Sequence, residues 1–284
     1  MSTRWGTRLV LAAALALVAG EVGAQMAELR VVRVREKGPF RDPAAAFWKD
    51  APATPVALLP QAMTLPNNLK PAVQSLQAKA VHDGKWLALL LEWPDATRSD
   101  RIVVDQFGDQ VAIEFPAEFK KDALPSPMMG NPGGRVEIWQ WRAAFQQDLE
   151  RGRPQVTNDL YPNAHADVYP DELLRAIDAR PYMGAVGVDN LITHADKSPV
   201  LEQLAEGWGS LTIQPDDQRA DGKGVWADGT WRVVVTHPLA GGEGHVGFAP
   251  GGESAVAFAV WDGGSREVGP RKAWSTWAAL KLAE

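Results

Sequence analysis

Hydrophobic residues in this chain recur in short runs, and each run is broken by Gly, Pro, Asn or Asp. Two pairs of runs flank Asp-Gly dipeptides, one at 83–84 and the other at 228–229. Asp-Gly between apolar runs is a strong signal for a tight turn between antiparallel strands. The pattern therefore predicts hairpins over residues 76–93 and 222–239.

Other runs have the length and composition of single strands, and they cover residues 109–115, 135–141, 254–263 and 274–282. In the run RVEIWQW (135–141), side chains alternate between the two faces of a strand. Val136 and Ile138 share one face, while Trp139 and Trp141 share the other.

Helical patterns are few and short. Residues 170–179 predict a short amphipathic helix with acidic residues in its first turn, and 198–206 predict a turn or two more. Both belong to or border a strand-poor excursion over roughly 145–200. Many short strands with turns between them are typical of a β-sandwich, so we expect one all-β domain over 28–284.

The N-terminus has the organisation of a secretory signal peptide. Arg4 and Arg8 precede an apolar run over 9–19, and small residues at 22–24 come just before Gln25. The sequence predicts a signal peptide over 1–24, with an uncleaved anchor as the alternative. The apolar run is shorter than the roughly 20 residues that span a bilayer, and no other segment is long enough. We therefore expect an exported, periplasmic mature chain without a membrane span.

Composition excludes several functions. The formal net charge is -6 and no basic run is present, which gives no support for nucleic-acid binding. The chain has no cysteine, so it cannot attach haem covalently, hold an iron–sulfur cluster or bind a metal through thiolates. Any haem must be bound non-covalently.

Motifs for catalysis are also missing from the sequence. There is no G-x-S-x-G elbow, no Gly-rich phosphate loop before a helix, and no pair of histidines at i, i+4. His82 and His237 neighbour turn residues and are predicted to be surface or turn histidines, and His165 in the excursion is also assigned no ligand role. We therefore expect a chain that is not an enzyme by itself.

The loop LPSPMMGNPGG (124–134) carries two adjacent methionines, Met128 and Met129. A methionine can fill a gap beneath a loop, or its thioether can bind iron or copper. The twelve tryptophans can likewise fill a wide core or line a flat aromatic ligand. Neither feature decides the function alone.

Five segments in order carry a family resemblance: PMMGNPGGRVEIWQWRA, NAHADVYP, GWGSLTIQP, GKGVWADGTWRVVVTHPL and FAVWDGGSREVGPRKAWSTWAAL. They resemble the haem b (gamma) subunit of periplasmic type II dimethyl-sulfoxide-reductase-like molybdoenzymes. That group includes the ethylbenzene, dimethylsulfide and steroid C25 dehydrogenases and the chlorate and selenate reductases. The resemblance implies one haem b at one end of the sandwich, with a methionine and a lysine as axial ligands.

On this resemblance the ligands are Met129, which precedes the loop glycine, and Lys272, which precedes the last strand. The doubled methionine leaves Met128 as a rival. Because neighbours in an extended chain point to opposite sides, only one of the two can face the iron. The resemblance also nominates tryptophans to line the ring (Trp139, Trp141, Trp261, Trp274) and arginines to pair with the propionates (Arg135, Arg142, Arg271).

The resemblance further implies an electron-transfer role. The chain would associate with a molybdenum catalytic (alpha) subunit and an iron–sulfur (beta) subunit, and would relay electrons between the iron–sulfur subunit and a carrier such as a periplasmic cytochrome c. Two alternatives from the residues stay open. One is an exported carbohydrate-binding β-sandwich that stacks sugars on tryptophan, and the other is an assembly subunit without cofactor.

Overall fold

The computed structural model describes residues 26–103, 106–163, 172, 176–178, 190–193, 195, 197–213, 217–242 and 244–284. The predicted signal peptide and His165 lie outside the described residues, as does most of the helix predicted over 170–179. Within the described ranges, none of the helices is both long and apolar enough for a bilayer crossing.

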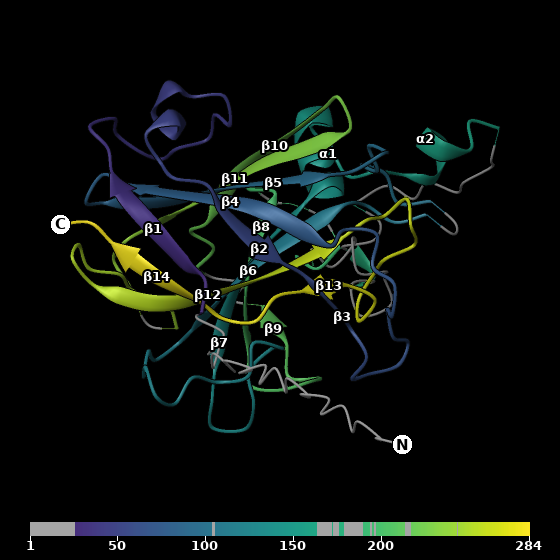
Figure 1. The fold of residues 1–284 in the computed structure, drawn as a ribbon. Coiled ribbons are helices and arrows are strands. Elements are labelled where there is room, and N and C mark those ends of the chain that lie inside the picture. Colours follow the sequence, from purple (N-terminus) through teal and green to yellow (C-terminus); the bar gives the residue numbers. More distant parts are fainter. Residues whose placement is uncertain are drawn as a thin grey trace, which may run out of the picture.

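The first sheet contains the two predicted hairpins, and both are confirmed (Figure 1). Its strands follow in the order β10 (Asp221–Ala227), β11 (Thr230–Pro238), β5 (Trp86–Pro94), β4 (Ser75–His82), β1 (Glu28–Arg33) and β14 (Ala278–Leu282), with β2 (Thr54–Ala57) beside β4. Only β1 pairs in parallel among these strands, with β4 and β14 as its neighbours.

The second sheet follows in the order β12 (Glu253–Trp261), β6 (Gln110–Pro116), β7 (Val136–Arg142), β8 (Val200–Ala205) and β9 (Thr212–Ile213), with β13 (Ala273–Trp274) beside β12 and β3 (Leu59–Pro60) beside β13. β12 belongs to both sheets, because residues 253–256 pair with β14 and residues 257–261 pair with β6. The chain thus forms one continuous sheet that folds over on itself.

Two expectations need correction. Residues 198–206 were expected to be helical, but they contain β8, an antiparallel partner of β7. The strand predicted over 274–282 is divided into β13 and β14. Glu, Gln and Leu are good helix formers in isolation, and burial in the sheet overrides that preference.

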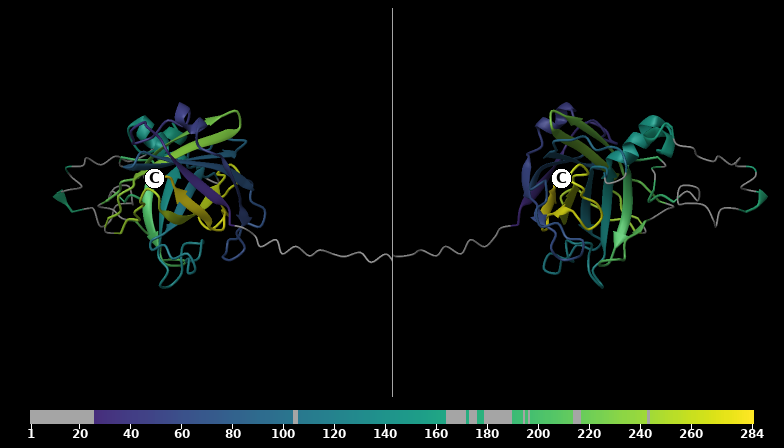
Figure 2. Two further views of the ribbon diagram at one scale, coloured as in Figure 1. Left: turned by 60° about the vertical axis from the view of Figure 1, so that its left-hand side comes forward. Right: turned by 90° about the vertical axis from the view of Figure 1, so that its right-hand side faces the viewer.

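The described helices are short and lie outside the two layers. They are the 3₁₀ turn η1 (Ala46–Lys49), α1 (Ala143–Arg151) and α2 (Thr157–Leu160). η1 and α1 lie on one side of the sandwich, at the top of the views in Figures 1 and 2, and α2 lies away from the strands.

Aromatic residues hold the two sheets face to face. The ring of Trp139 on β7 stacks on that of His237 on β11 with centroids 4.4 Å apart, and Trp141 meets Trp231 edge-on at 5.0 Å. All four side chains are buried in the core between the sheets. This arrangement confirms the predicted all-β sandwich.

Each sheet also has apolar side chains on its outer face. On the first sheet, Phe40 and Trp48 from the segment around η1 cover Val81, Leu90 and Val234. On the second sheet, the outer cluster is rich in alanine, and Trp274 and Met129 are packed against it. The second outer face carries the candidate site.

Candidate cofactor site

A cavity of about 790 Å³ lies against the outer face of the second sheet. Its floor is built from alternate residues of four neighbouring strands: Ala257, Ala259 and Trp261 of β12, Ala112 and Glu114 of β6, Ile138, Gln140 and Arg142 of β7, and Gln203 of β8. Side chains two apart on a strand share a face, so the alternation selects one set for the cavity. The cavity therefore lies on a sheet face, and not at one end of the sandwich as predicted.

The alanines make this floor suitable for a flat ligand. Ala112, Ala257 and Ala259 are small and sit side by side on β6 and β12, where register pairs Ala112 with Ala259. Large side chains at these positions would fill the space above the sheet. The volume is within the range of roughly 300–1,000 Å³ typical of cofactor pockets.

Loops from distant parts of the chain supply the walls. Met128 and Met129 come from the loop before β7, and Lys272 and Trp274 come from the last loop and β13. Phe107 and Trp208 line the cavity from two further loops. Met129 and Lys272, the two residues nominated as iron ligands, thus face the same cavity.

The loop around Met129 is held in a specific conformation. Met129 has φ 66°, in the left-handed region that non-glycine residues rarely adopt. Its N–H donates to Glu114 Oε2 at 3.3 Å, and its carbonyl accepts from the Gly207 N–H at 2.7 Å. Backbone strain at a ligand-facing residue is typical of a functional position, because surrounding contacts must maintain it.

The glycine after Met129 permits this loop. Gly130 has φ 71°, and a Cβ there would lie 2.4 Å from the Gly134 carbonyl oxygen. Its N–H donates to the Ser126 carbonyl at 3.0 Å, which closes a tight turn. The Met-Gly pair therefore places the Met129 side chain beside the outer cluster of the sheet.

Lys272 has the surroundings of an amine that can lose its proton. It makes no hydrogen bond or ion pair within the described part of the chain, and its Nζ lies 5.3 Å from the ring centroid of Trp261. Burial lowers the pKa of Lys272, while the charge of Glu114 opposes that change. A neutral amine has a lone pair that it can donate to a metal.

Glu114 lies between the two nominated ligands. Burial raises the pKa of Glu114 to about 7, although the Lys272 charge and the Met129 N–H act in the opposite direction. Its Oε1 atom is buried without a hydrogen-bond partner. A carboxyl group that protonates near neutral pH leaves the Lys272 amine without a fixed counter-charge, which favours the neutral amine.

Arg142 is the cationic group on the cavity floor. Its guanidinium donates to the Ile192 carbonyl and to Gln140 Oε1, and its Nε is buried without a partner. Burial lowers the pKa of Arg142 to about 10, so it stays charged at neutral pH. Of the three nominated arginines, Arg142 is the one that lines the cavity and can meet an anionic substituent.

Three other nominations are corrected. Trp139 and Trp141 point into the core between the sheets, opposite to Ile138 and Gln140, and do not line the cavity. Arg271 is not a lining residue either, although its neighbours Pro270 and Lys272 are. The alternation of β7 was read correctly, but the face that carries the ligand was assigned wrongly.

Of the remaining predicted site residues, some line the cavity and one lies in solvent. Trp261 and Trp274 line the cavity, and each indole N–H is already bonded to a backbone carbonyl, of Gly269 and Pro60 respectively. Arg135 is directed to solvent, where it meets Glu206 at 3.5 Å. Met128 also lines the cavity and is more buried than Met129.

Sequence reasoning missed the alanine floor, Glu114, Gln140 and Gln203. The signal for the alanines and Glu114 is the alternation in DQVAIEF and SAVAFAV, where small or polar residues on one face of a buried strand oppose large apolar ones. That pattern indicates a buried strand face whose small side chains leave space for a ligand.

The site fits a non-covalently bound haem in its donor set. Haem needs a cavity with apolar walls, axial donors, and cations near its propionates. The cavity supplies two thioethers, one amine with a lowered pKa, and Arg142.

A cluster of three buried aspartates borders the cavity wall. Asp95, Asp109 and Asp262 bring carboxylate oxygens within 4.8 Å of one another. Burial raises the pKa of Asp109 to about 7 and that of Asp95 to about 6, and mutual repulsion adds to both changes. Asp95 Oδ2 is buried without a hydrogen-bond partner.

These raised pKa values predict that the protein becomes less stable from pH 5 to pH 8. Above pH 4 the unfolded chain has ionised aspartates, whereas the folded chain retains the protons of Asp95 and Asp109, so deprotonation opposes folding. Each pKa unit corresponds to about 1.4 kcal/mol, so the decrease amounts to a few kcal/mol. Urea unfolding at both pH values, with chelator present, measures it.

Asp95→Asn is expected to remove part of this pH dependence. The amide keeps the acceptor for the Thr97 N–H, replaces the unpartnered oxygen by a donor, and removes one of the repelling charges. The variant should gain about 1–2 kcal/mol at pH 8 and little at pH 5. Exposed Asp122→Asn is the control, and an equal gain at both pH values would contradict the explanation.

The sequence of this chain matches a known protein family and two known proteins. Residues 45–273 match the family model described as ethylbenzene dehydrogenase. The chain is 28% identical over 266 residues to chlorate reductase subunit gamma of Ideonella dechloratans, covering 91% of this chain and 87% of that protein. It is 23% identical over 253 residues to a Haloferax mediterranei protein provisionally named respiratory nitrate reductase heme subunit, covering 88% and 71%.

Solved structures give a weaker likeness. A family 9 carbohydrate-binding module from Caldicellulosiruptor kristjanssonii in complex with glucose has 13% identity and a TM-score of 0.43, with 90% of this chain and 95% of that chain covered. A similarity at this level carries no argument about sugar binding here.

The fold and the cavity define an all-β sandwich with a cofactor-sized site on one outer face. The match covers most of the sequence, and the chain belongs to the ethylbenzene dehydrogenase family.

Proposed function

We propose that this chain is the haem b electron-transfer subunit of a periplasmic molybdoenzyme complex. The observation that carries the proposal is the meeting of Met129 and Lys272, from loops far apart in sequence, at one cavity of suitable size. The relatives support it, since one is named a gamma subunit of chlorate reductase and another a heme subunit.

In the proposed site, Met129 and Lys272 would hold the haem iron. A bound haem supplies one-electron chemistry, as its iron alternates between the ferric and ferrous states. The thioether of Met129 is soft and neutral and favours ferrous iron, and the amine of Lys272 donates its lone pair once its proton has left. Two protein ligands leave no open iron position, which favours electron transfer over substrate chemistry.

The other residues orient and shield the cofactor. Ala112, Ala257 and Ala259 allow a flat ring to lie close to the sheet, and the indole rings of Trp261 and Trp274 exclude water. Arg142 pairs with an anionic propionate. These roles require no residue of this chain to act as acid, base or nucleophile, so we propose that it is not catalytic by itself.

The assembly follows from the same proposal. The chain joins a molybdenum catalytic subunit and an iron–sulfur subunit, and it relays electrons between the latter and an external carrier such as cytochrome c.

Residues 1–24 serve as a signal peptide and 28–284 form the single domain. Fractionation of the native host with N-terminal sequencing of the mature chain tests localisation, and a chain that retains Met1 in the cytoplasm would contradict it.

A visible and paramagnetic-resonance spectrum of the chain, exported in a host supplied with haem, tests the cofactor. A Soret band with sharp α and β bands on reduction, together with a low-spin ferric signal, is the expected result. A colourless chain that binds oligosaccharides would instead favour the carbohydrate-binding alternative. A colourless chain without either ligand would favour an assembly subunit.

Ala259→Leu is expected to lower haem occupancy without disturbing the sandwich core. The larger side chain projects from the floor into the cavity, and overpacking of this kind typically costs about 1–3 kcal/mol, or roughly tenfold in affinity. Haem per chain after titration gives the measurement. Ala53→Leu, at an exposed position, is the matched control and should bind haem as the parent does.

A further inference from the structure

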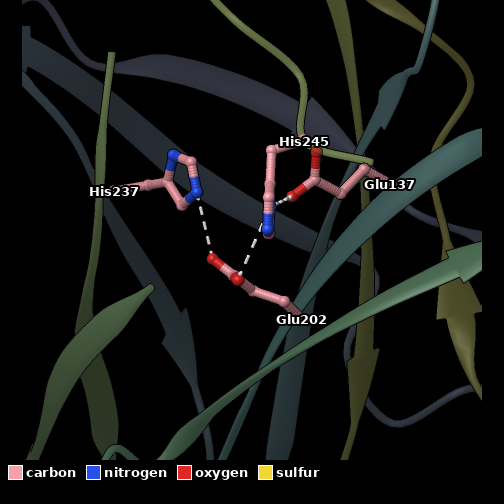
Figure 3. A group of neighbouring side chains, drawn as sticks. All are labelled: Glu137, Glu202, His237 and His245. Carbon is pink, nitrogen blue, oxygen red and sulfur yellow. Dashed lines mark hydrogen bonds and ion pairs between the residues drawn. The ribbon is translucent and has the colours of Figure 1, made fainter. Parts of the chain in front are cut away.

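A second cluster of metal-binding side chains lies inside the sandwich, away from the cavity. Glu137 on β7, Glu202 on β8, His237 on β11 and His245 in the loop after β11 direct their polar ends toward one another (Figure 3). One ligand atom from each residue lies within 4.8 Å of the others. All four side chains are 0% exposed.

Neutral N–H donors hold the two carboxyl groups in place. Glu137 accepts from the Trp139 indole N–H at 2.9 Å and from the Val246 N–H. Glu202 accepts from the Arg219 and Ala220 N–H groups at 2.9 and 2.6 Å. These hydrogen bonds fix the orientation of both carboxyl groups within the core.

His237 directs a lone pair at one of these carboxylates. Its Nδ1 lies 2.6 Å from the Pro238 carbonyl, which can only accept, so Nδ1 carries the hydrogen. The Nε2 of the neutral ring is then an acceptor, and it lies 3.0 Å from Glu202 Oε1. Nε2 makes no hydrogen bond of acceptable geometry, so a buried acceptor faces another acceptor.

His245 lies between carboxylates on both sides. Its Nδ1 is 3.1 Å from Glu137 Oε1 and 3.7 Å from Glu202 Oε2, and its Nε2 is 3.0 Å from Asp217 Oδ2. A neutral imidazole has one N–H and can serve only one side. The Nδ1 contact with Glu137 has hydrogen-bond geometry, whereas the buried Nε2 makes no hydrogen bond with Asp217. With the hydrogen moved to Nε2, on the side of the partly exposed Asp217, the Nδ1 lone pair would join that of His237 Nε2 in the cluster.

A divalent metal ion would satisfy the lone pairs that face one another in this cluster. Two carboxylates with neutral histidines carry a charge of −2 in a core that excludes water, and a divalent ion neutralises it. The outer contacts match those of metal ligands, since a ligating histidine almost always donates its other N–H to a backbone carbonyl or a carboxylate. Pro238 O accepts at one of these positions, and Asp217 Oδ2 lies 3.0 Å from the other, where a small rotation of its partly exposed side chain would complete the hydrogen bond.

We propose that these four residues bind one structural zinc ion, which links the two sheets. Two imidazole nitrogens and two carboxylate oxygens are a tetrahedral set that zinc accepts, and ligand atoms in such a site lie about 3.3 Å apart. Three contacts in the cluster, of 3.0, 3.1 and 3.7 Å, lie near that value, the first and the last made by different oxygens of Glu202. Four protein ligands close the coordination, so the ion is structural rather than catalytic.

The zinc site is independent of the haem proposal. Glu137 and Ile138 are neighbours on β7 with side chains on opposite faces, so the zinc lies in the core while the cavity lies outside. The ion would fix β7 and β8, which form part of the cavity floor, against β11 of the other sheet. Metal content can thus be measured whether or not haem is bound.

The test measures metals in the full exported chain, purified without chelator and then loaded with zinc and dialysed. We expect about one zinc per chain, and zinc-edge X-ray absorption that fits two nitrogen and two oxygen neighbours at about 2.0–2.2 Å. Absence of zinc both before and after loading would overturn the proposal and assign the balancing charge to protons. An X-ray absorption spectrum that shows water ligands, or oxygen neighbours without nitrogen, would overturn it as well.

Variants distinguish zinc bound by the four core residues from zinc bound at the protein surface. Asp217→Asn changes a partly exposed outer contact, so the chain should fold, and zinc affinity should fall about 10–100-fold. His237→Gln should reduce the zinc to a small fraction of one per chain, whereas His82→Gln, at another buried histidine outside the cluster, should not. Equal zinc in the parent and in His237→Gln, or an unchanged zinc affinity in Asp217→Asn, would contradict the site.

Discussion

Replacing Met129 by alanine is expected to abolish the low-spin haem spectrum and to lower the reduction potential of whatever haem remains bound. The thioether stabilises ferrous iron, so its loss favours the ferric state. Axial ligands set haem potentials over about 0.8 V, and a shift on the order of 0.1 V or more is expected. Redox titration followed by visible spectroscopy measures it.

Met128→Ala is the matched comparison for this prediction. Met128 is the more buried of the pair and lines the same cavity, so its truncation should cost about 2–5 kcal/mol of stability and leave the low-spin spectrum in place. Met129→Ala keeps a non-glycine residue at φ 66°, so the backbone penalty is unchanged. If Met128→Ala alone removes the low-spin signal, the ligand assignment must be exchanged.

The strands were predictable because each carries its signal locally. Asp83-Gly84 and Asp228-Gly229 sit between apolar runs, and the structure forms hairpins at both places. β8 was missed since SPVLEQLAE has helix-like composition, and its pairing with β7 supplies what the segment itself lacks. α1 follows β7 directly without a side-chain cap, which left no signal for its start.

The site was predictable only in part, because strand alternation does not reveal which face a ligand occupies. β7 is buried on both faces, with Trp139 in the core and Ile138 at the cavity. Trp139 and Trp141 have the flat rings expected beside a haem, yet they fill the space between the sheets. Met129 and Lys272 were nominated by the family resemblance, and spacing alone would not have selected either one.

Buried polar groups were the hardest feature to predict. His82 and His237 neighbour turn residues and were expected at the surface, but both are 0% exposed. His237 bonds through Nδ1 to the Pro238 carbonyl, and its Nε2 lies 3.0 Å from Glu202, on a strand of the other sheet. A partner 35 residues away in sequence and on a different layer leaves no local pattern.

Replacing Lys272 by arginine is expected to remove the second iron ligand while keeping a positive charge in the cavity. Arginine stays protonated in proteins and has no lone pair to give, so charge alone cannot replace the amine. The expected result is loss of the low-spin ferric signal in Lys272→Arg and Lys272→Ala alike. Paramagnetic resonance of the haem-loaded chain measures it.

A small primary amine should restore the signal in Lys272→Ala and fail to do so in Lys272→Arg. The alanine variant leaves space where the side chain was, and an added alkylamine can bring a neutral nitrogen to the iron, whereas arginine still fills that space. Lys281→Ala is the control, since Lys281 is exposed and paired with Glu28 at 2.7 Å. If Lys272→Arg kept the parent spectrum, the amine would not be a ligand, because no atom of arginine could substitute for it. Low-spin haem in that variant would require another donor, and Met128, which lines the same cavity, would then become the first candidate to be replaced.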